Sequence, residues 1–227
     1  IEIRGAKPKE LKNWLWDFDA HPMSKDDLKD QKEYIQKAKA GYQGELYKTE
    51  AFLSAHPYGT VPAAFSPDGK IGVFESNSIM RAVARLDKSN SGLYGHDPYS
   101  ASRIDGFLDT TLLFARESQI YLLALMADKL NEKVYYDTER ALTNWLSGIE
   151  SALTNNDFIC SDALTLADIC FCCELLLLQS EHQWIEAITE IGEKLLSSKA
   201  IEDRFPRSLN HYEKLSARTD FSPDIKD

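Results

Sequence analysis

The chain has 227 residues, 43% of them hydrophobic, so it is long enough to bury one large core or two small ones. Its formal net charge of -10 argues against a nucleic-acid partner, because such binding rests mainly on Lys and Arg that neutralise phosphates. No run reaches the ~18 uncharged apolar residues of a membrane-spanning helix, and no secretory leader pattern opens the sequence. These features predict a cytoplasmic protein without a membrane span.

The first fifty residues have short, unequal patterns. Ile1 to Arg4 alternates apolar and polar residues and is followed by Gly5, which predicts a short strand. Apolar residues then recur at helical spacing from Leu11 to Phe18 and predict an amphipathic helix. Residues 23–50 are dominated by Lys, Asp, Glu and Gln, which is typical of a solvated helix or an inserted loop. We interpret 23–50 as a peripheral polar insertion.

The stretch 60–98 has clearer signals. Two apolar runs, 60–65 and 71–74, are joined by a turn containing Pro67, Asp68 and Gly69, which predicts a β-hairpin. A helix is expected to open at Ser76 and to carry apolar residues on one face as far as Leu86. Residues 87–98 are rich in Ser, Asn and Gly and are interpreted as a linker.

Only helices are expected after Tyr99. Helical patterns cover 100–128, 134–153, 165–179 and 183–198. The third is apolar on nearly every side, so we expect it at the centre of a helical domain. Its start is marked by Thr165 and Asp168, which have the spacing of a capping box.

The four cysteines lie at positions 160, 170, 172 and 173. Three of them fall in one helical run, which is poor spacing for a disulfide framework and indicates a reducing compartment. On a helix Cys170, Cys172 and Cys173 point in diverging directions, and no histidine lies close in sequence. We therefore expect small buried hydrophobic residues and no metal site.

Two places in the N-terminal half could bind a ligand. Pro62 cannot donate to a sheet ladder and can be cis, so it either makes a rigid turn or presents the Val61 backbone to an extended peptide-like ligand. At the next strand-to-helix junction, Ser76 and the free N–H groups of the helix start can hold an anion, while Glu75 can meet an ammonium. That pair suits an α-amino acid head group. The alternative is a plain helix cap.

The combination of motifs resembles the cytosolic glutathione transferase superfamily. In chain order the motifs are Phe52-Leu53, His56-Pro57-Tyr58-Gly59-Thr60-Val61-Pro62, Phe74-Glu75-Ser76-Asn77-Ser78-Ile79 and Leu164-Thr165-Leu166-Ala167-Asp168-Ile169. The resemblance implies an α/β plus all-α chain. It would have a thioredoxin-like N-terminal domain over residues 1–87, an all-helical domain over 97–215 and a tail over 216–227.

The resemblance also implies roles for individual residues. Val61 and a cis Pro62 would bind the cysteinyl part of glutathione, the co-substrate, through backbone bonds, and Glu75 with Ser76 would hold its γ-glutamyl head. Thr165 and Asp168 would cap the core helix of the helical domain. On the 100–128 helix, by analogy only, the residues that would face a second substrate are Arg103, Phe107 and Thr110.

The residue that would activate the glutathione thiol stays unassigned. Family enzymes use a Tyr, Ser or Cys just after the first strand. If residues 1–4 are that strand, the position holds Gly5, Ala6 and Lys7, with no hydroxyl or thiol. If they are the second strand, the catalytic residue would lie upstream of Ile1, and we favour this alternative. The N-terminal domain would then lack its first strand and helix.

Three functions remain open. The leading one is a glutathione transferase that joins the glutathione thiolate to a small electrophile. The second is a non-catalytic assembly module, because residues 68–79 resemble the N-terminal domain of the gamma subunit of eukaryotic translation elongation factor 1. The third is a scaffold subunit of a larger complex, suggested by the polar insertion at 23–50. Dimerisation is the habit of the family, so a homodimer is expected.

Overall fold

The computed structural model describes residues 2–27, 35–37, 45–89, 91–198 and 203–222. The chain divides into two compact units, Ile1–Leu86 and Asp87–Asp227.

Unit 1 opens with short elements. A 3-10 helix, η1 (Pro8–Asn13), is followed by β1 (Trp14–Trp16), β2 (His21–Pro22), β3 (Ile35–Lys37) and β4 (Glu45–Lys48). These strands form one sheet in the order β2-β1-β4-β3. β1 is parallel to β4, with Leu15 opposite Tyr47, and the other two pairs are antiparallel.

Two predictions for the first twenty residues are wrong. Residues 2–7 form no strand, and Ile1 lies outside the described residues. The helix predicted from Leu11 to Phe18 is instead the end of η1 followed by β1. Trp14 and Trp16 lie on one side of β1 with their rings stacked at 5.8 Å. Bulky aromatic residues in alternation fit a pleated strand, and this local preference outweighs the helical spacing.

The interpretation of 23–50 as a polar insertion also needs correction. The range contains β3 and β4, and β4 is a central strand of the sheet. Leu46 and Lys48 are both buried there. The charge of Lys48 disguises the strand, because a buried lysine breaks the apolar pattern that would reveal it. Residues 28–34 and 38–44 lie outside the described residues.

The second half of unit 1 agrees with the expected hairpin and helix. α2 (Glu50–Ala55) is capped by Thr49, whose hydroxyl accepts from Phe52 N–H. β5 (Ala63–Phe65) and β6 (Gly72–Phe74) form a separate antiparallel two-stranded sheet, and α3 (Ser76–Leu86) follows. Gly69 closes the hairpin turn at a φ of +72°, a conformation that favours glycine.

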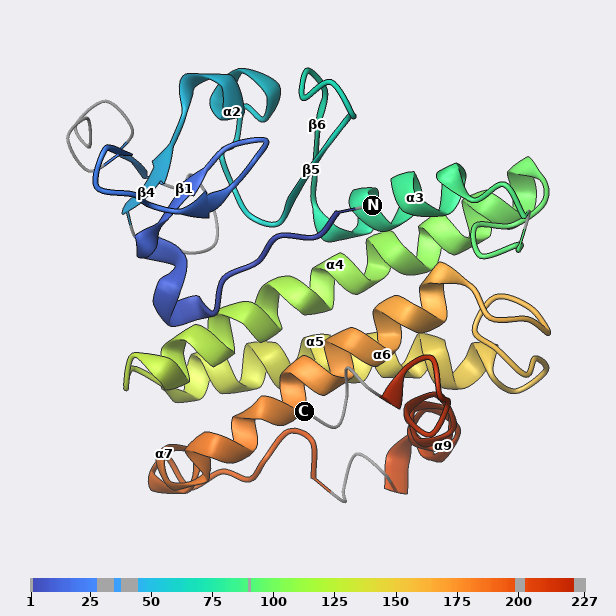
Figure 1. Cartoon of the computed structure of the whole chain (residues 1–227). Helices are drawn as coiled ribbons and strands as arrows, with labels where there is room; N and C mark the ends of the chain where they lie inside the picture. Colours follow the sequence, from blue (N-terminus) through green and yellow to red (C-terminus); the bar gives the residue numbers. More distant parts are fainter. Residues whose placement is uncertain (1, 28–34, 38–44, 90, 199–202, 223–227) are drawn as a thin grey trace. The chain divides into compact units, whose positions relative to one another are not determined.

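The described part of unit 2 contains helices and connecting loops but no strand. Its main helices are α4 (Pro98–Met126), α5 (Glu132–Ala152) and α6 (Leu166–Gln179), which lie side by side (Figure 1). η3 (Ser180–Trp184), α7 (Ile185–Glu190) and α9 (Pro206–Ser216) complete the unit. The single helix predicted over 183–198 is wrong. α7 ends at Glu190, and Gly192 has a φ of +81° that breaks the helical path.

The core of unit 2 is centred on α6. The capping box at its start is confirmed, because Thr165 N–H donates to the Asp168 carboxylate at 2.8 Å. Asp168 also accepts from Ile159 N–H at 2.9 Å and from the His211 ring at 2.8 Å, which ties α6 to α9. In the described ranges, no helix is long and apolar enough to cross a membrane.

None of the four cysteines, all of which lie among the described residues, forms a disulfide bond. Cys170 and Cys172 are buried as expected, but Cys173 is exposed on the outer side of α6. Over the described part of the chain, no group of three metal-binding side chains comes together.

Candidate functional site

The loop between α2 and β5, residues 56–62, forms one side of the candidate site in unit 1. His56 organises this loop from inside: Thr60 N–H donates to its Nε2 at 3.1 Å, and the same nitrogen lies 2.8 Å from Thr60 O. Gly59, at a φ of +61°, donates its N–H to His56 O at 3.0 Å. The loop is therefore held by its own first residue.

Val61 and Pro62 follow directly, and the peptide bond between them is cis, as expected. The Val61 side chain packs against the cluster of Trp16, Leu46 and Phe52. Its backbone lies before the β5–β6 ladder, which begins at Ala63. In the described ranges neither its N–H nor its C=O is engaged in a hydrogen bond. Val61 thus leaves one donor and one acceptor for a peptide-like ligand.

Glu75 connects β6 to α3 in an unusual conformation. Its φ is +67°, in the left-handed region that a non-glycine residue enters at a cost of about 1 kcal/mol or more. Its C=O accepts the first helical bond, from Ile79 N–H at 3.0 Å, so Glu75 and not Ser76 is the N-cap. The expected alternative, in which Ser76 merely caps its helix, is therefore wrong.

Ser76 instead occupies the first turn of α3 with its donors available. Its side chain is exposed, and no partner for it is found among the residues that the structure describes. The Ser76 hydroxyl and the N–H groups at this helix start favour an anion, and the helix dipole adds to this. The exposed Glu75 carboxylate beside it favours a cation.

Lys48, which the sequence patterns did not single out, belongs to the same site. It is 1% exposed, and its Nζ has no hydrogen-bond partner among the residues that the structure describes. A β-carbon placed on Gly59 would lie 3.5 Å from this Nζ, so the ammonium lies against the 56–62 loop. Burial lowers the pKa of Lys48. A buried cation without a counter-ion is costly, and an arriving carboxylate would remove that cost.

These groups also act on His56. Its pKa lies below the ordinary value, mainly because burial disfavours the charged ring. The contact with Thr60 O opposes this shift, Lys48 adds to it, and Glu75 opposes it. Lys48, His56 and Glu75 therefore form one electrostatically connected group within unit 1.

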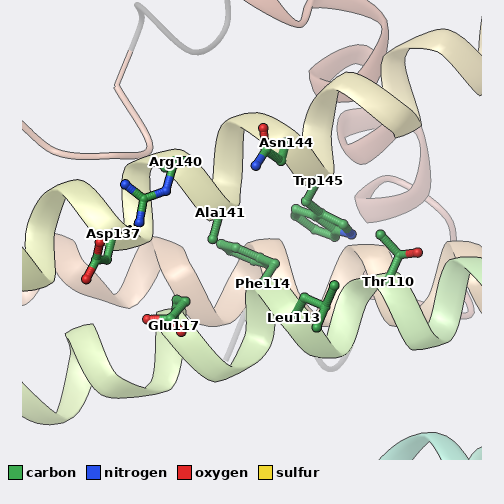
Figure 2. A pocket seen from close by; sticks show the side chains of 9 residues that line it. All are labelled: Thr110, Leu113, Phe114, Glu117, Asp137, Arg140, Ala141, Asn144 and Trp145. Atoms are coloured by element: carbon green, nitrogen blue, oxygen red, sulfur yellow. Dashed lines mark hydrogen bonds and ion pairs between the residues drawn. The ribbon is translucent and has the colours of Figure 1, made fainter.

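In unit 2 the three side chains expected to face a second substrate do not form one cluster. The Arg103 guanidinium lies 5.5 Å from the Phe107 ring centroid, and Phe107 packs on the helical core. Thr110, one turn further along α4, instead lines a cavity of about 300 Å³ between α4 and α5 (Figure 2). Its hydroxyl donates to Gly106 O at 2.8 Å.

The cavity at Thr110 combines an aromatic wall with a charged rim. The rings of Phe114 and Trp145 stack with centroids 4.4 Å apart. Asp137 lies on the rim and accepts hydrogen bonds from Lys133 and from Arg140, the latter at 2.6 Å, and these bonds hold its pKa below the usual range. Such a wall and rim suit a small aromatic group with a polar end.

Comparison with known proteins finds similarity to glutathione S-transferases and to elongation factor 1-gamma. Residues 113–182 match the family "Glutathione S-transferase, C-terminal domain". Over 139 residues the chain is 32% identical to "Probable elongation factor 1-gamma 1" of Arabidopsis thaliana, a match that covers 59% of this chain and 32% of that protein. It is 30% identical over 130 residues to "Glutathione S-transferase F9" of the same organism, covering 54% of this chain and 60% of the relative. The chain thus spans about a third of the length of the elongation-factor relative.

The fold has a counterpart among solved structures. A glutathione S-transferase of Methylobacillus flagellatus, with glutathione bound, superposes with a TM-score of 0.55 and 16% identity over 76% of this chain and 78% of that one. At this identity the likeness establishes the fold, which has a thioredoxin-like N-terminal part and a helical C-terminal part.

Proposed function

We propose that unit 1 binds glutathione, because residues 113–182 match the C-terminal domain of the glutathione S-transferases and the chain has their fold. The observation that carries the proposal is the junction of β6 and α3. There Glu75 is held at a positive φ beside a Ser76 whose hydroxyl is unpaired in the described ranges. Strained backbone of this kind persists where the surrounding structure imposes it, and often where a ligand uses it.

The groups around the site match the tripeptide along its length. Glu75 would meet the γ-glutamyl ammonium, and Ser76 with the start of α3 would hold the neighbouring carboxylate. The free N–H and C=O of Val61 would pair with the cysteinyl backbone as an added strand does. Lys48 would donate to the glycyl carboxylate, since its four-carbon side chain can turn its ammonium toward the ligand.

Calorimetric titration with glutathione tests this proposal. We expect binding in the wild-type chain and a roughly 30-fold weaker affinity in Glu75→Gln, from the ~2 kcal/mol of a charge-assisted hydrogen bond. Glu186→Gln, an exposed change on α7, serves as the control and should bind as the wild type does. A folded wild-type protein that gives no binding heat would refute glutathione recognition.

For the protein as a whole, we favour a role as an assembly module. α4 is apolar on two opposite faces: one packs into the core of unit 2, and the other is exposed. The exposed face carries Leu112, Leu113, Ile120 and Leu123. Leu113 is 71% exposed, which is unusual for a leucine on a long, well-formed helix. A second copy of the chain or a partner subunit would cover this face. The similarity to elongation factor 1-gamma supports this role.

Conjugation of glutathione to a small electrophile is the second candidate function. The α4–α5 cavity favours it, because its aromatic wall and volume of about 300 Å³ suit a small aromatic substrate. The similarity to glutathione S-transferase F9 also supports it. Turnover of a chlorinated nitroaromatic with glutathione separates the two functions. Conversion above the uncatalysed rate supports the enzyme, whereas glutathione binding without turnover supports the module.

A further inference from the structure

His56 lies at the centre of the candidate site without touching solvent. The residue is 0% exposed, and its ring stacks on Phe74 of β6 with centroids 4.8 Å apart and planes within 4°. On another side it lies 5.5 Å from the Phe52 ring of α2. The imidazole therefore joins α2, β6 and the 56–62 loop, so a change in its charge acts on all three.

The two ring nitrogens of His56 have different surroundings. Nε2 is engaged by the backbone of Thr60. Nδ1 is buried and lacks a hydrogen-bond partner in the described ranges. Because Nε2 accepts from Thr60 N–H, the neutral ring carries its proton on Nδ1. Protonation would place a second N–H at Nε2, break that hydrogen bond and leave a buried positive charge in the ring. The arrangement therefore favours the neutral ring while the site is empty of ligand.

Two charged groups act on the charge of the ring. Lys48 comes from the end of β4, and its ammonium, which has no partner within the described part of the chain, disfavours a second positive charge at His56. Glu75 comes from the end of β6 and favours that charge, but its effect on His56 is smaller than that of Lys48. The balance in the free protein is therefore set against protonation. It would change if an anion neutralised Lys48.

We infer that His56 takes up a proton when the site binds the carboxylate of its peptide ligand, so that ligand binding and protonation of His56 are coupled. The inference rests on the proposed function, in which the glycyl carboxylate of glutathione pairs with Lys48. That pairing removes the main opposing charge. The ligand ammonium would also neutralise Glu75, whose charge favours protonation of His56 but has a smaller effect than that of Lys48. Because linkage is reciprocal, affinity rises as the pH falls toward the titration range of the free histidine.

Calorimetry with S-methylglutathione tests the coupling without interference from a thiol proton, because this ligand is a thioether. Titration at about pH 6 in buffers of different ionisation enthalpy gives the number of protons taken up. We expect about half a proton per site for the wild-type chain. The glycyl monoethyl ester of the same ligand, which lacks the carboxylate charge, should bind more weakly and take up no proton.

Two variants assign the proton. His56→Asn should bind S-methylglutathione without proton uptake, and Lys48→Gln should lose the uptake because the opposing charge is already absent. His182→Asn, at an exposed histidine of η3, is the control and should keep the proton uptake of the wild-type chain. Binding by the wild-type chain without uptake, or equal uptake by His56→Asn, would overturn the coupling and leave the proposed function intact. Absence of any binding would overturn both.

Discussion

Replacement of Asp168 by Asn should destabilise unit 2 more than any exposed substitution. The Asp168 side chain is 0% exposed, and it accepts from Thr165 N–H at 2.8 Å, Thr165 Oγ1 at 3.0 Å, Ile159 N–H at 2.9 Å and His211 Nε2 at 2.8 Å. Asparagine keeps one acceptor oxygen and turns an NH₂ group toward the remaining donors. At least one buried donor then loses its partner, at a cost of about 1–3 kcal/mol.

The total loss of stability should exceed the cost of that one unpaired donor, because the carboxylate charge also strengthens these hydrogen bonds. We expect Asp168→Asn to lower the free energy of unfolding by about 3 kcal/mol. Urea unfolding followed by tryptophan fluorescence measures the change, since Trp145 lies in the core beside Phe171. Asp162→Asn, four residues before the α6 start and exposed, is the matched control and should change stability by less than about 0.5 kcal/mol. Equal stability of the two variants would refute the role given to Asp168.

Three further predictions concern charge and assembly. Burial raises the pKa of Glu174 to about 7, so the stability that this side chain contributes is present at low pH and is lost as the pH rises through that value. At about pH 8, Glu174→Gln should therefore be more stable than the wild type by roughly 1–2 kcal/mol. A denaturant midpoint no higher than that of the wild type would contradict this prediction. Leu113→Glu should reduce self-association or partner binding in light scattering after size exclusion, whereas Leu177→Glu, at an exposed leucine of α6, should leave it unchanged; equal behaviour of both variants counts against the α4 face. Lys48→Gln should weaken glutathione binding by roughly tenfold or more while raising unfolding stability, because it removes a buried charge that has no partner among the described residues; unchanged affinity would show that Lys48 does not contact the ligand.

The helical unit could be predicted closely because its signals are local. The capping box at Thr165 and Asp168 lies within four residues, and the linker before α4 is marked by its composition. What the pattern could not supply was the purpose of Asp168 beyond the cap. Its contact with His211 joins residues that lie 43 positions apart.

The sheet of unit 1 is harder to predict from the sequence because it pairs distant segments. β1 and β4 are parallel neighbours although about thirty residues separate them, and each is only a few residues long. The buried Lys48 interrupts the apolar alternation of β4, so both the strand and the site residue escaped notice together. The available signal for a strand over 45–48 was the adjacent hydrophobic pair Leu46 and Tyr47.

The chemistry of the Glu75–Ser76 pair and its place in a family motif can be identified in the sequence, whereas its backbone conformation requires the structure. A carboxylate beside a helix start is visible in sequence, but the positive φ at Glu75 is a property of the folded backbone. It transfers the cap position to Glu75 and leaves the Ser76 hydroxyl available. This is the difference between a helix cap and a candidate ligand site.

The most direct test of glutathione recognition is a titration of the isotope-labelled chain with glutathione, followed by amide chemical shifts. The proposal predicts saturable shifts of the Val61 and Ser76 amides, with the same apparent affinity at both and a marked weakening in Glu75→Gln. Binding that moves neither amide, or that is unaffected by Glu75→Gln, would contradict the assignment of the site.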